Sequence, residues 1–311
     1  MTEFNEIRSL LQDKADLNAR LALIPYEGTP EIKEVNGKRY IYVRKRIGSR
    51  VTSKYVGSYS DELLELLLRD TRAARELRRE MRIIEKKLAS LGYEETELPL
   101  RVLENLDFAR VNLKANIYDQ AILEGVATSF PQTEEIIENG KVSGMTATDI
   151  QKILDLKHAW EFILDKNVIQ AKSDLAVLSH IARLVNEGFF YDGGKIRSVP
   201  VTIGGSSYVP PLPIESQIRE EIEEIVDSDK NDIEKAILLC LYTMKRQIFL
   251  DGNKRAAVIF ANHYLIAHGG GLLDIPESRV PEFKRLLVSY YEGEDPDIMI
   301  TFLKEKCLKK F

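Results

Sequence analysis

Two cations and a carboxylate lie at a short turn sequence in the second half of the chain. Asp251, Gly252 and Asn253 are typical turn residues, and Lys254 and Arg255 follow them directly. Apolar residues recur at helical spacing on both sides, so we expect one helix to end before this turn and another to begin just after it. The start of a helix offers unpaired backbone N–H groups and the positive end of the helix dipole, which both attract anions. Because a carboxylate oxygen suits a hard cation, the stretch predicts a triphosphate bound with its magnesium ion. An ordinary helix corner with solvated side chains is the alternative.

The same stretch resembles the core motif of the Fic/Doc family, which reads His-x-Phe-x-(Asp/Glu)-Gly-Asn-Gly-Arg-x-x-Arg. Membership of that family implies a Fic-type (Fido) helical bundle that transfers AMP or a phosphoryl group from ATP with magnesium to a hydroxyl group of a target protein. The resemblance assigns Phe249 as the core anchor of the catalytic motif and Asp251 as the magnesium ligand. It assigns the nucleotide's phosphates to a run of four residues: Gly252, Asn253, Lys254 and Arg255.

Three positions depart from the family motif. Gln247 stands where the catalytic histidine is expected, Lys254 replaces the second glycine, and Val258 replaces the second arginine. The lysine resembles the Doc branch, whose members transfer a phosphoryl group rather than AMP. A glutamine amide can orient a hydroxyl group but cannot take its proton, and general-base help is worth about 10²–10⁴-fold in rate. We therefore expect either a nucleotidyltransferase or phosphotransferase whose AMPylation or phosphorylation is slowed, with Gln247 orienting the hydroxyl, or a pseudoenzyme that serves as a nucleotide-responsive regulatory module.

A β-hairpin is expected over residues 193–211, ahead of the motif. Val199, Val201 and Ile203 alternate with other residues, and the glycines and serines that follow suit a hairpin tip. A hairpin edge can bind an extended target segment by strand addition. The hairpin resembles the flap of Fic proteins, which places the target side chain over the phosphates. On that resemblance the target-binding residues are Arg197, Val201, Ile203 and Tyr208. A plain surface hairpin is the alternative.

The helix expected over residues 103–123 ends at Glu124-Gly125. This pair resembles the end of the motif (Ser/Thr)-x-x-x-Glu-(Gly/Asn), whose glutamate blocks the productive position of the γ-phosphate in many Fic proteins. Gln120 stands at the Ser/Thr position, and Val258 replaces the arginine with which that glutamate usually pairs. An inhibitory role of Glu124 and a plain helix end therefore stay open as alternatives.

Residues 1–96 are expected to form a separate accessory region with a small α/β fold. A first helix over 2–23 should end at a turn over 27–30, strands should cover 37–57, and Ser60 should cap a long helix to about Leu91. The 37–57 hairpin carries no acid and seven cations: Lys38, Arg39, Arg44, Lys45, Arg46, Arg50 and Lys54.

Basic residues interleaved with tyrosines suit phosphates and bases. Nucleic acid is therefore one candidate partner of the 37–57 hairpin. An arginine stripe expected on the following helix would contribute to the same binding surface. A solvated basic face is the alternative. The accessory region would equally serve as a dimerisation arm, which would make the protein a homodimer, or as a docking module for a protein partner.

Residues 97–311 are expected to be helical apart from the flap hairpin, so the fold class is mostly α. Eight segments have helical patterns: 103–123, 131–140, 146–164, 174–187, 233–244, 255–266, 281–291 and 295–310. The fifth and sixth of these flank the motif and must hold its turn in place.

The composition of the chain predicts a protein with one sizeable core and a second, smaller core. The 311 residues are 44% hydrophobic and 30% charged, and a net charge of −5 gives no global attraction to nucleic acid. Cys240 and Cys307 have no metal-ligand spacing and are expected to be reduced thiols. The start of the chain lacks a signal-peptide pattern and no apolar run is long enough to span a membrane, so we expect a cytoplasmic protein without membrane contact.

Overall fold

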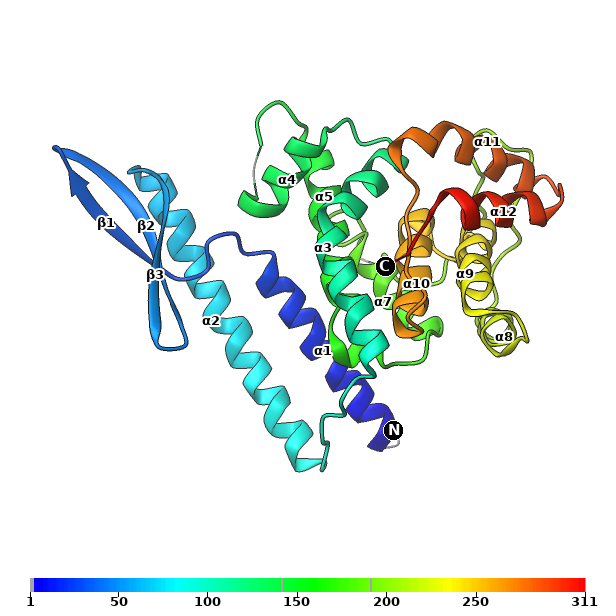
Figure 1. The fold of residues 1–311 in the computed structure, drawn as a ribbon, viewed down its shortest axis with the longest axis horizontal. Coiled ribbons are helices and arrows are strands. Elements are labelled where there is room, and N and C mark those ends of the chain that lie inside the picture. Colours follow the sequence, from blue (N-terminus) through cyan, green and yellow to red (C-terminus); the bar gives the residue numbers. More distant parts are fainter. Residues whose placement is uncertain (1–2, 141, 191, 311) are drawn as a thin grey trace. The chain divides into compact units, whose positions relative to one another are not determined.

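The chain divides into two compact units, whose helices and strands are labelled in Figure 1. The computed structural model describes residues 3–140, 142–190 and 192–310. Unit 1 contains residues 1–95 and 138–140, and unit 2 contains residues 96–137 and 141–311. The chain is mostly helical with a small α/β region at its start, as the sequence predicted.

Unit 1 consists of two helices and a three-stranded antiparallel sheet. Its elements are α1 (Glu3–Ala22), β1 (Thr29–Val35), β2 (Lys38–Ile47), β3 (Arg50–Ser58) and α2 (Asp61–Ser90), and the strand order is β1-β2-β3. The expected β2–β3 hairpin is confirmed, and so is the cap of α2, where the Leu63 N–H donates to Ser60 Oγ at 3.1 Å. Strand β1 was not predicted. Its first residues, Thr29 and Pro30, were interpreted as a turn, but Pro30 is tolerated because β1 is an edge strand.

The core of unit 1 is small. Ile41 and Val43 of β2 pack with Leu67 of α2, and partly buried side chains surround them: Tyr26, Val56, Tyr59, Leu63 and Leu64. Helix α2 therefore covers one face of the sheet, and the alternating residues of β2 point away from it.

Unit 2 is a bundle of helices. It contains α3 (Leu100–Leu123), all but the last two residues of α4 (Phe130–Asn139), α5 (Ala147–Ile163), α6 (Lys166–Ile169), α7 (Leu175–Leu184), α8 (Glu215–Asp227), α9 (Asp232–Arg246), α10 (Asn253–Ala267), the 3₁₀ helix η1 (Glu277–Arg279), α11 (Val280–Tyr291) and α12 (Pro296–Lys306). Two short strands, β4 (Leu272–Leu273) and β5 (Leu308–Lys309), pair antiparallel. The last helix was expected to reach Lys310 but ends at Lys306, because the residues after it form the pairing with β4.

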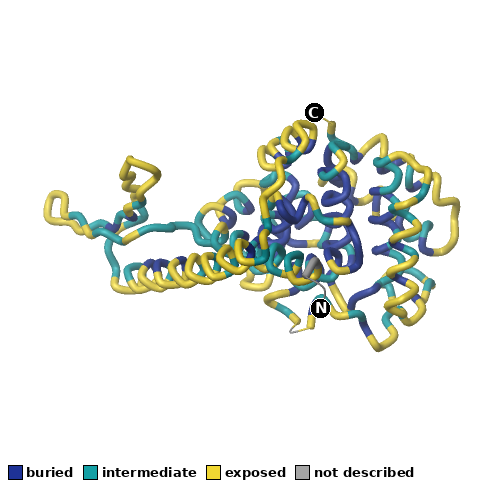
Figure 2. Tube along the Cα trace, turned by 90° about the horizontal axis from the view of Figure 1, so that it is seen from below, coloured by how far each residue is buried: buried dark blue, intermediate teal, exposed yellow. Residues whose placement is uncertain are grey.

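Helix α10 lies at the centre of unit 2. Every residue of α10 except Lys254 and Ala267 is buried, and the helix packs against α9, α7, α3 and α5. Figure 2 shows buried segments concentrated in the helices of unit 2, whereas the sheet and α2 of unit 1 are mostly exposed or intermediate. Helix α10 is therefore covered by neighbouring helices on nearly all sides, and these hold its start in place.

The prediction of a β-hairpin over residues 193–211 is wrong. Residues 197–214 contain no strand, and the nearest pairing is an isolated bridge between Ile196 and Phe249. Proline at 200, 210 and 211 removes backbone donors that a ladder would need. In addition, the guanidinium of Arg197 takes the carbonyl oxygens of Val199, Pro210 and Pro211 as acceptors. The segment is therefore a loop, which we call the Arg197 loop (residues 197–214).

None of the helices in the described part of the chain combines the length and the apolar character that a bilayer-spanning helix needs. Cys240 and Cys307 are both buried, free thiols.

Candidate functional site

The turn between α9 and α10 is shaped by two residues in left-handed backbone conformations. Helix α9 ends at Gln247, with φ 46°, and Gly252 has φ 75° at the start of α10. A Cβ atom on Gly252 would lie 2.6 Å from Nδ2 of Asn186, so only glycine fits there. No side chain caps α10. Within the described residues, no acceptor is assigned to the backbone N–H groups of Asn253, Lys254 and Arg255. These groups and the helix dipole form an anion site.

The side chain of Asn253 closes the turn on itself. Its Oδ1 accepts from the Phe249 N–H at 3.0 Å, and its Nδ2 donates to the Phe249 carbonyl at 2.8 Å. Asn253 is buried and Phe249 is fully buried. The Asn253 amide therefore fixes the loop, and the part of this residue that remains for an anion is its backbone N–H.

The Gln247 amide is engaged at both ends. Its Nε2 donates to the Met244 carbonyl at 2.7 Å, and its Oε1 accepts from Asn253 Nδ2 at 3.2 Å. Its backbone carbonyl accepts from Arg197 Nε at 2.6 Å. The side chain thus ends α9 and braces the turn.

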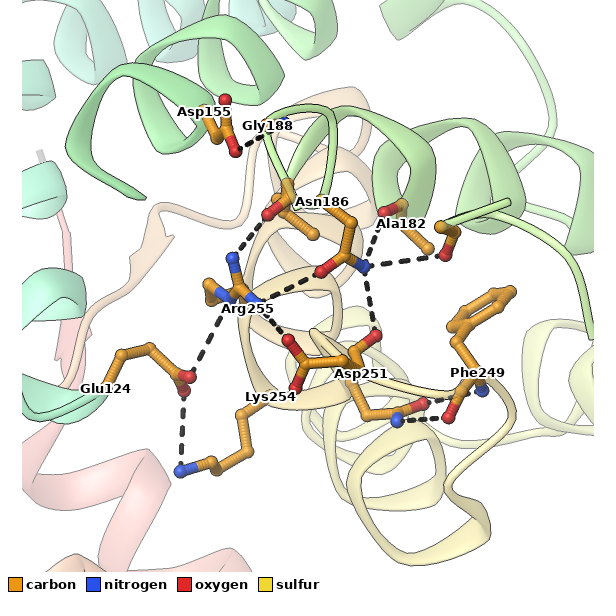
Figure 3. A network of polar contacts seen from close by, with 12 residues as sticks. Glu124, Asp155, Ala182, Asn186, Gly188, Phe249, Asp251, Lys254 and Arg255 are labelled. Atoms are coloured by element: carbon orange, nitrogen blue, oxygen red, sulfur yellow. Dashed lines mark hydrogen bonds and ion pairs between the residues drawn. The ribbon is translucent and has the colours of Figure 1, made fainter. Parts of the chain in front are cut away.

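The guanidinium of Arg255 is buried in a polar network between α7 and the turn (Figure 3). Nη1 donates to the Val185 carbonyl, and Nη2 donates to Asn186 Oδ1 at 3.1 Å and to Asp251 Oδ2 at 2.8 Å. The Asp251 side chain is 53% exposed. Its other carboxylate oxygen accepts no hydrogen bond from the described residues, so it remains available to a ligand.

Glu124 lies against both cations of the motif (Figure 3). Its Oε1 is 3.5 Å from Lys254 Nζ, and its Oε2 is 3.7 Å from Arg255 Nε. Both separations exceed that of a good hydrogen bond. Among the described residues, Glu124 Oε1 and Arg255 Nε are buried and have no hydrogen-bond partner, although each lies within ion-pair distance of an opposite charge. Glu124 is also the C-cap of α3, so it is both a helix end and a contact of the cations.

Gln120, at the position where the inhibitory motif has Ser or Thr, ties α3 to α10. Its Nε2 donates to the Arg255 carbonyl at 2.8 Å, and its Oε1 accepts from Trp160 Nε1 at 3.0 Å. These two bonds fix the last turn of α3, and therefore the place of Glu124.

Two residues of the network had no signal in the sequence. Asn186 is fully buried; its Nδ2 donates to the carbonyls of Ala182 at 2.9 Å and Asp251 at 3.0 Å. Asp155 accepts from Gln151 Nε2 at 2.7 Å, and burial raises the pKa of its carboxyl to about 6. Asp155 lies in α5 and Asn186 in the turn after α7, far from the motif along the chain, and no short motif contains them.

Arg197, predicted to bind the target, is buried and holds the Arg197 loop to the motif. It donates to the carbonyls of Gln247 at 2.6 Å, Val199 at 2.7 Å and Pro211 at 2.7 Å. Burial lowers the pKa of its guanidinium, and nearby Arg246 acts in the same direction. The loop tip is fixed by Glu292, whose Oε1 accepts from the Ser207 N–H at 2.9 Å.

The other three flap residues are partly exposed. Val201 and Ile203 precede the loop tip, and the ring of Tyr208 stacks on Tyr291 with centroids 6.4 Å apart. Lys245 Nζ lies 5.3 Å from the centroid of the Tyr208 ring. The Tyr208 side chain therefore lies beside the end of α9.

Within the described part of the chain, no group of three or more His, Cys, Asp and Glu side chains is arranged to hold a metal ion. Magnesium usually binds through one or two carboxylates together with phosphate and water oxygens. One half-exposed carboxylate beside an anion site, as at Asp251, fits that mode of binding.

Two family models match segments of the chain. Residues 172–265 match the Fic/DOC family, and residues 4–65 match a domain of unknown function (DUF6788). The first match contains the whole motif from Gln247 to Val258 and confirms the resemblance seen in the sequence. No curated protein sequence matches the chain.

Solved structures of Fic proteins have a similar fold. Fic-1 from C. elegans is 18% identical, with a TM-score of 0.53 over 76% of this chain and 72% of that one. A Fic domain containing signaling protein from Bacteroides thetaiotaomicron is 18% identical, with a TM-score of 0.53 over 67% and 85%. A Fic family protein from Desulfovibrio desulfuricans G20 is 15% identical, with a TM-score of 0.52 over 68% and 75%. At these identities the likeness shows the Fic-type fold alone.

Proposed function

We propose that this chain, which carries a Fic/DOC domain at residues 172–265, binds ATP with magnesium at the start of α10. We further propose that it transfers AMP or a phosphoryl group slowly to a protein hydroxyl. Fic-type domains generally transfer AMP. The observation that carries the proposal is the set of backbone N–H groups at Asn253, Lys254 and Arg255, to which no acceptor is assigned among the described residues.

Each residue of the turn has a defined task in this proposal. The three N–H groups and the Lys254 ammonium donate to phosphate oxygens, and Gly252 leaves room for the backbone to approach them. Arg255 Nε, now a buried donor without an acceptor, contributes one more hydrogen bond. Asp251 holds magnesium together with the phosphates, and that ion supplies neutralisation of the charge on the transferring group.

Removal of the proton from the attacking hydroxyl is the step that this site supports least. The amide of Gln247 has no basic lone pair, so it can orient a hydroxyl but cannot deprotonate it. Positioning and charge stabilisation remain, and they carry much of phosphoryl-group chemistry. We therefore expect a transfer rate about 10²–10⁴-fold below that of the same site with a general base.

A second candidate function is a nucleotide-responsive module without catalysis. The two hydrogen bonds of the Gln247 amide favour it, because they use this side chain to brace the turn and not to face a substrate. In this case ATP binding would change the conformation of the turn, and a partner protein would bind one conformation better than the other.

Glu124 is proposed to inhibit the site. Its carboxylate lies 3.5 Å from Lys254 Nζ and 3.7 Å from Arg255 Nε, where it neutralises the two cations that a phosphate would meet. Bound phosphate would bring further negative charge beside this carboxylate, so Glu124 opposes binding until it moves.

Two partner surfaces follow from the same proposal. A target protein would dock on the Arg197 loop, through Val201, Ile203 and Tyr208, while Arg197 itself keeps the loop in place. The basic hairpin of unit 1 (residues 37–57) would bind nucleic acid or a protein.

The free thiols of Cys240 and Cys307 are compatible with a reducing compartment, and we propose that the protein is cytoplasmic.

Calorimetric titration of ATP–magnesium into the full chain tests the site directly. Lys254→Ala is the informative variant, because Lys254 is half-exposed and its removal leaves the buried network intact. We expect ATP to bind wild type and to bind the variant roughly tenfold more weakly, the loss of about one charged hydrogen bond. If wild type does not bind ATP, the proposal is refuted.

Transfer is tested with ATP labelled at the α- or the γ-phosphate, in the presence of cell lysate. We expect Gln247→His to label proteins about 10²–10⁴-fold faster than wild type, because histidine restores a general base. Label from the α-phosphate would indicate AMP transfer, and label from the γ-phosphate would indicate phosphoryl transfer. ATP binding without label in either protein would favour the non-catalytic module.

A further inference from the structure

The sheet of unit 1 has one face that none of the described elements of the unit covers. Side chains alternate along a strand. Because Ile41 and Val43 pack on Leu67 of α2, the neighbouring side chains of β2 point to the opposite face. We call this opposite face the outer face; from β2 it carries Lys38, Tyr40, Tyr42, Arg44 and Arg46.

Three tyrosines form a cluster on the outer face. Tyr42 of β2 is paired with Tyr55 of β3, and their ring centroids are 5.5 Å apart. The Tyr40 ring lies 6.1 Å from that of Tyr55, which is 51% exposed. Tyr40 and Tyr42 are partly exposed, and Lys33 Nζ lies 4.5 Å from the centroid of the Tyr42 ring. The exposed Tyr55 ring therefore offers the flat apolar surface on which a planar group can stack.

The sheet is strongly basic, in contrast to the chain as a whole. Residues 29–58 contain eight Lys and Arg and two Glu, a net charge of +6, whereas the whole chain has a net charge of −5. The positive charge is therefore concentrated in one small element, as expected of a surface that binds an anionic polymer.

The cations of the sheet fall into two groups according to whether they have a partner within unit 1. Three cations of the covered face have such a partner. Arg39 lies 3.9 Å from the Tyr59 ring, Lys45 Nζ is 2.6 Å from Glu27 Oε2, and Lys54 Nζ lies 4.8 Å from the Tyr26 ring.

On the outer face, Lys33 of β1 pairs with Glu31, with Nζ 3.7 Å from Oε2. Four other cations, on the outer face or at the hairpin tip, have no acidic side chain within 4.0 Å among the described residues: Lys38, Arg44, Arg46 and Arg50. The arginine stripe of α2 does not extend this surface, because α2 packs on the other face of the sheet.

We propose that the outer face binds single-stranded nucleic acid. Bases stack on Tyr55 and its neighbouring rings, and phosphates pair with the four unpartnered cations. A single strand fits better than a duplex, because a base must be unstacked from its own neighbours before it can lie on a tyrosine ring. An acidic protein would satisfy the cations but would give the rings no stacking partner. The inference makes specific, and rests on, the proposed partner site on the basic hairpin; it is independent of the ATP site.

Fluorescence anisotropy with a labelled oligo-dT of about 20 nucleotides tests this surface on the full chain. We expect saturable binding by wild type, with log K falling against log salt concentration at a slope of about −3, since each of four neutralised phosphates contributes roughly −0.7. Tyr55→Ala should weaken binding roughly tenfold or more, because stacking of one base is lost. The triple variant Lys38→Gln, Arg44→Gln, Arg46→Gln should flatten the slope to about −0.7.

A matched control removes the same number of cations from α2, in the triple variant Arg72→Gln, Arg75→Gln, Arg79→Gln, and should leave affinity and slope unchanged. No binding by wild type, or an equal loss in this control, would overturn the inference. So would a duplex, or an oligoglutamate, that competes as well as oligo-dT. Thermal melting verifies that each variant is folded, and ATP titration into the same samples shows separately whether the nucleotide site fails.

Discussion

Glu124 is the residue whose charge most directly opposes phosphate binding in this structure. Its carboxylate is 15% exposed and faces Lys254 and Arg255 at 3.5 and 3.7 Å. We expect Glu124→Gln to raise the affinity for ATP–magnesium roughly tenfold, because a negative charge beside the phosphates is replaced by an amide of the same shape. Calorimetric titration measures this change.

The control for Glu124 is another acid of unit 2 that pairs with a lysine. Glu134 on α4 lies 2.9 Å from Lys114 Nζ and has no contact with the motif among the described ion pairs. Glu134→Gln should leave ATP affinity unchanged. An affinity for ATP that stays the same or falls in Glu124→Gln would mean that this carboxylate supports the site and does not inhibit it.

The titration of Asp155, beside the network around Arg255, makes the free energy of unfolding depend on pH. Burial raises the pKa of its carboxyl from 3.8 to about 6, against the opposing effects of the Gln151 and Gly188 hydrogen bonds and of Arg255. Below pH 3.8 the Asp155 carboxyl is protonated in both the folded and the unfolded state. Between that value and about pH 6 the unfolded state loses its proton first, so the free energy of unfolding falls as pH rises.

We therefore expect Asp155→Asn to be more stable than wild type at neutral pH, by at most roughly 3 kcal/mol. The amide oxygen can keep the hydrogen bond from Gln151. The difference should shrink as pH falls through the window in which wild-type Asp155 takes up its proton. Thermal unfolding of both proteins across this pH range is the measurement, and a variant that is less stable at every pH would contradict the expectation.

At the scale of elements, the turn before α10 depends on the absence of a side chain at Gly252. Gly252→Ala combines a strained backbone, φ 75°, with a Cβ atom 2.6 Å from the buried Asn186 amide. We expect it to lower the free energy of unfolding by roughly 2–4 kcal/mol and to abolish ATP binding, because Asn186 must move and it holds Asp251 and Arg255. Chemical denaturation and ATP titration measure the two effects.

Gly205 provides a matched control for that variant. It has φ 82° in the Arg197 loop, but a Cβ atom there would meet nothing within 4 Å. Gly205→Ala should therefore lower the free energy of unfolding by the backbone strain alone, about 1–2 kcal/mol, and should retain ATP binding. Equal losses in the two variants would show that the contact with Asn186 does not matter.

The Arg197 loop shows how an element can be mispredicted from correct local patterns. Alternating Val199, Val201 and Ile203 favour a strand, but strand pairing needs backbone donors and acceptors on both sides. Prolines remove donors, and one buried guanidinium removes three acceptors. The guanidinium comes to its position only because α9 and the motif turn present the Gln247 carbonyl to it, which the local pattern does not contain.

At the scale of the whole molecule, the two units differ in the size of their cores. The sheet of unit 1 has two buried apolar residues, Ile41 and Val43, whereas α10 in unit 2 is buried along nearly its whole length. Local opening costs less where fewer apolar contacts must be broken. We expect the amides of β1–β3 to exchange hydrogen much faster than those of α10, as measured by mass spectrometry of peptides. Protection of the sheet equal to that of α10 would contradict this.

The sequence by itself determined most of the helices, the motif and the basic hairpin, because each depends on residues close together in the chain. Helices α6 and α8 were not among the predicted segments. Helical spacing placed α9 and α10 to within a few residues, and turn chemistry placed Gly252 between them. Family resemblance in the motif indicated the fold that the structure has.

Only the tertiary structure decided what the side chains of the motif contact. Asn186 joins the site from the turn after α7, and Asp155 from α5. Glu124 reaches the cations from the end of α3, and Gln247 turns inward to brace its own loop. The division of the basic hairpin into a covered face and an outer face likewise depends on α2. Such contacts join residues distant in sequence, and a hydrogen bond or ion pair depends on the position of both partners.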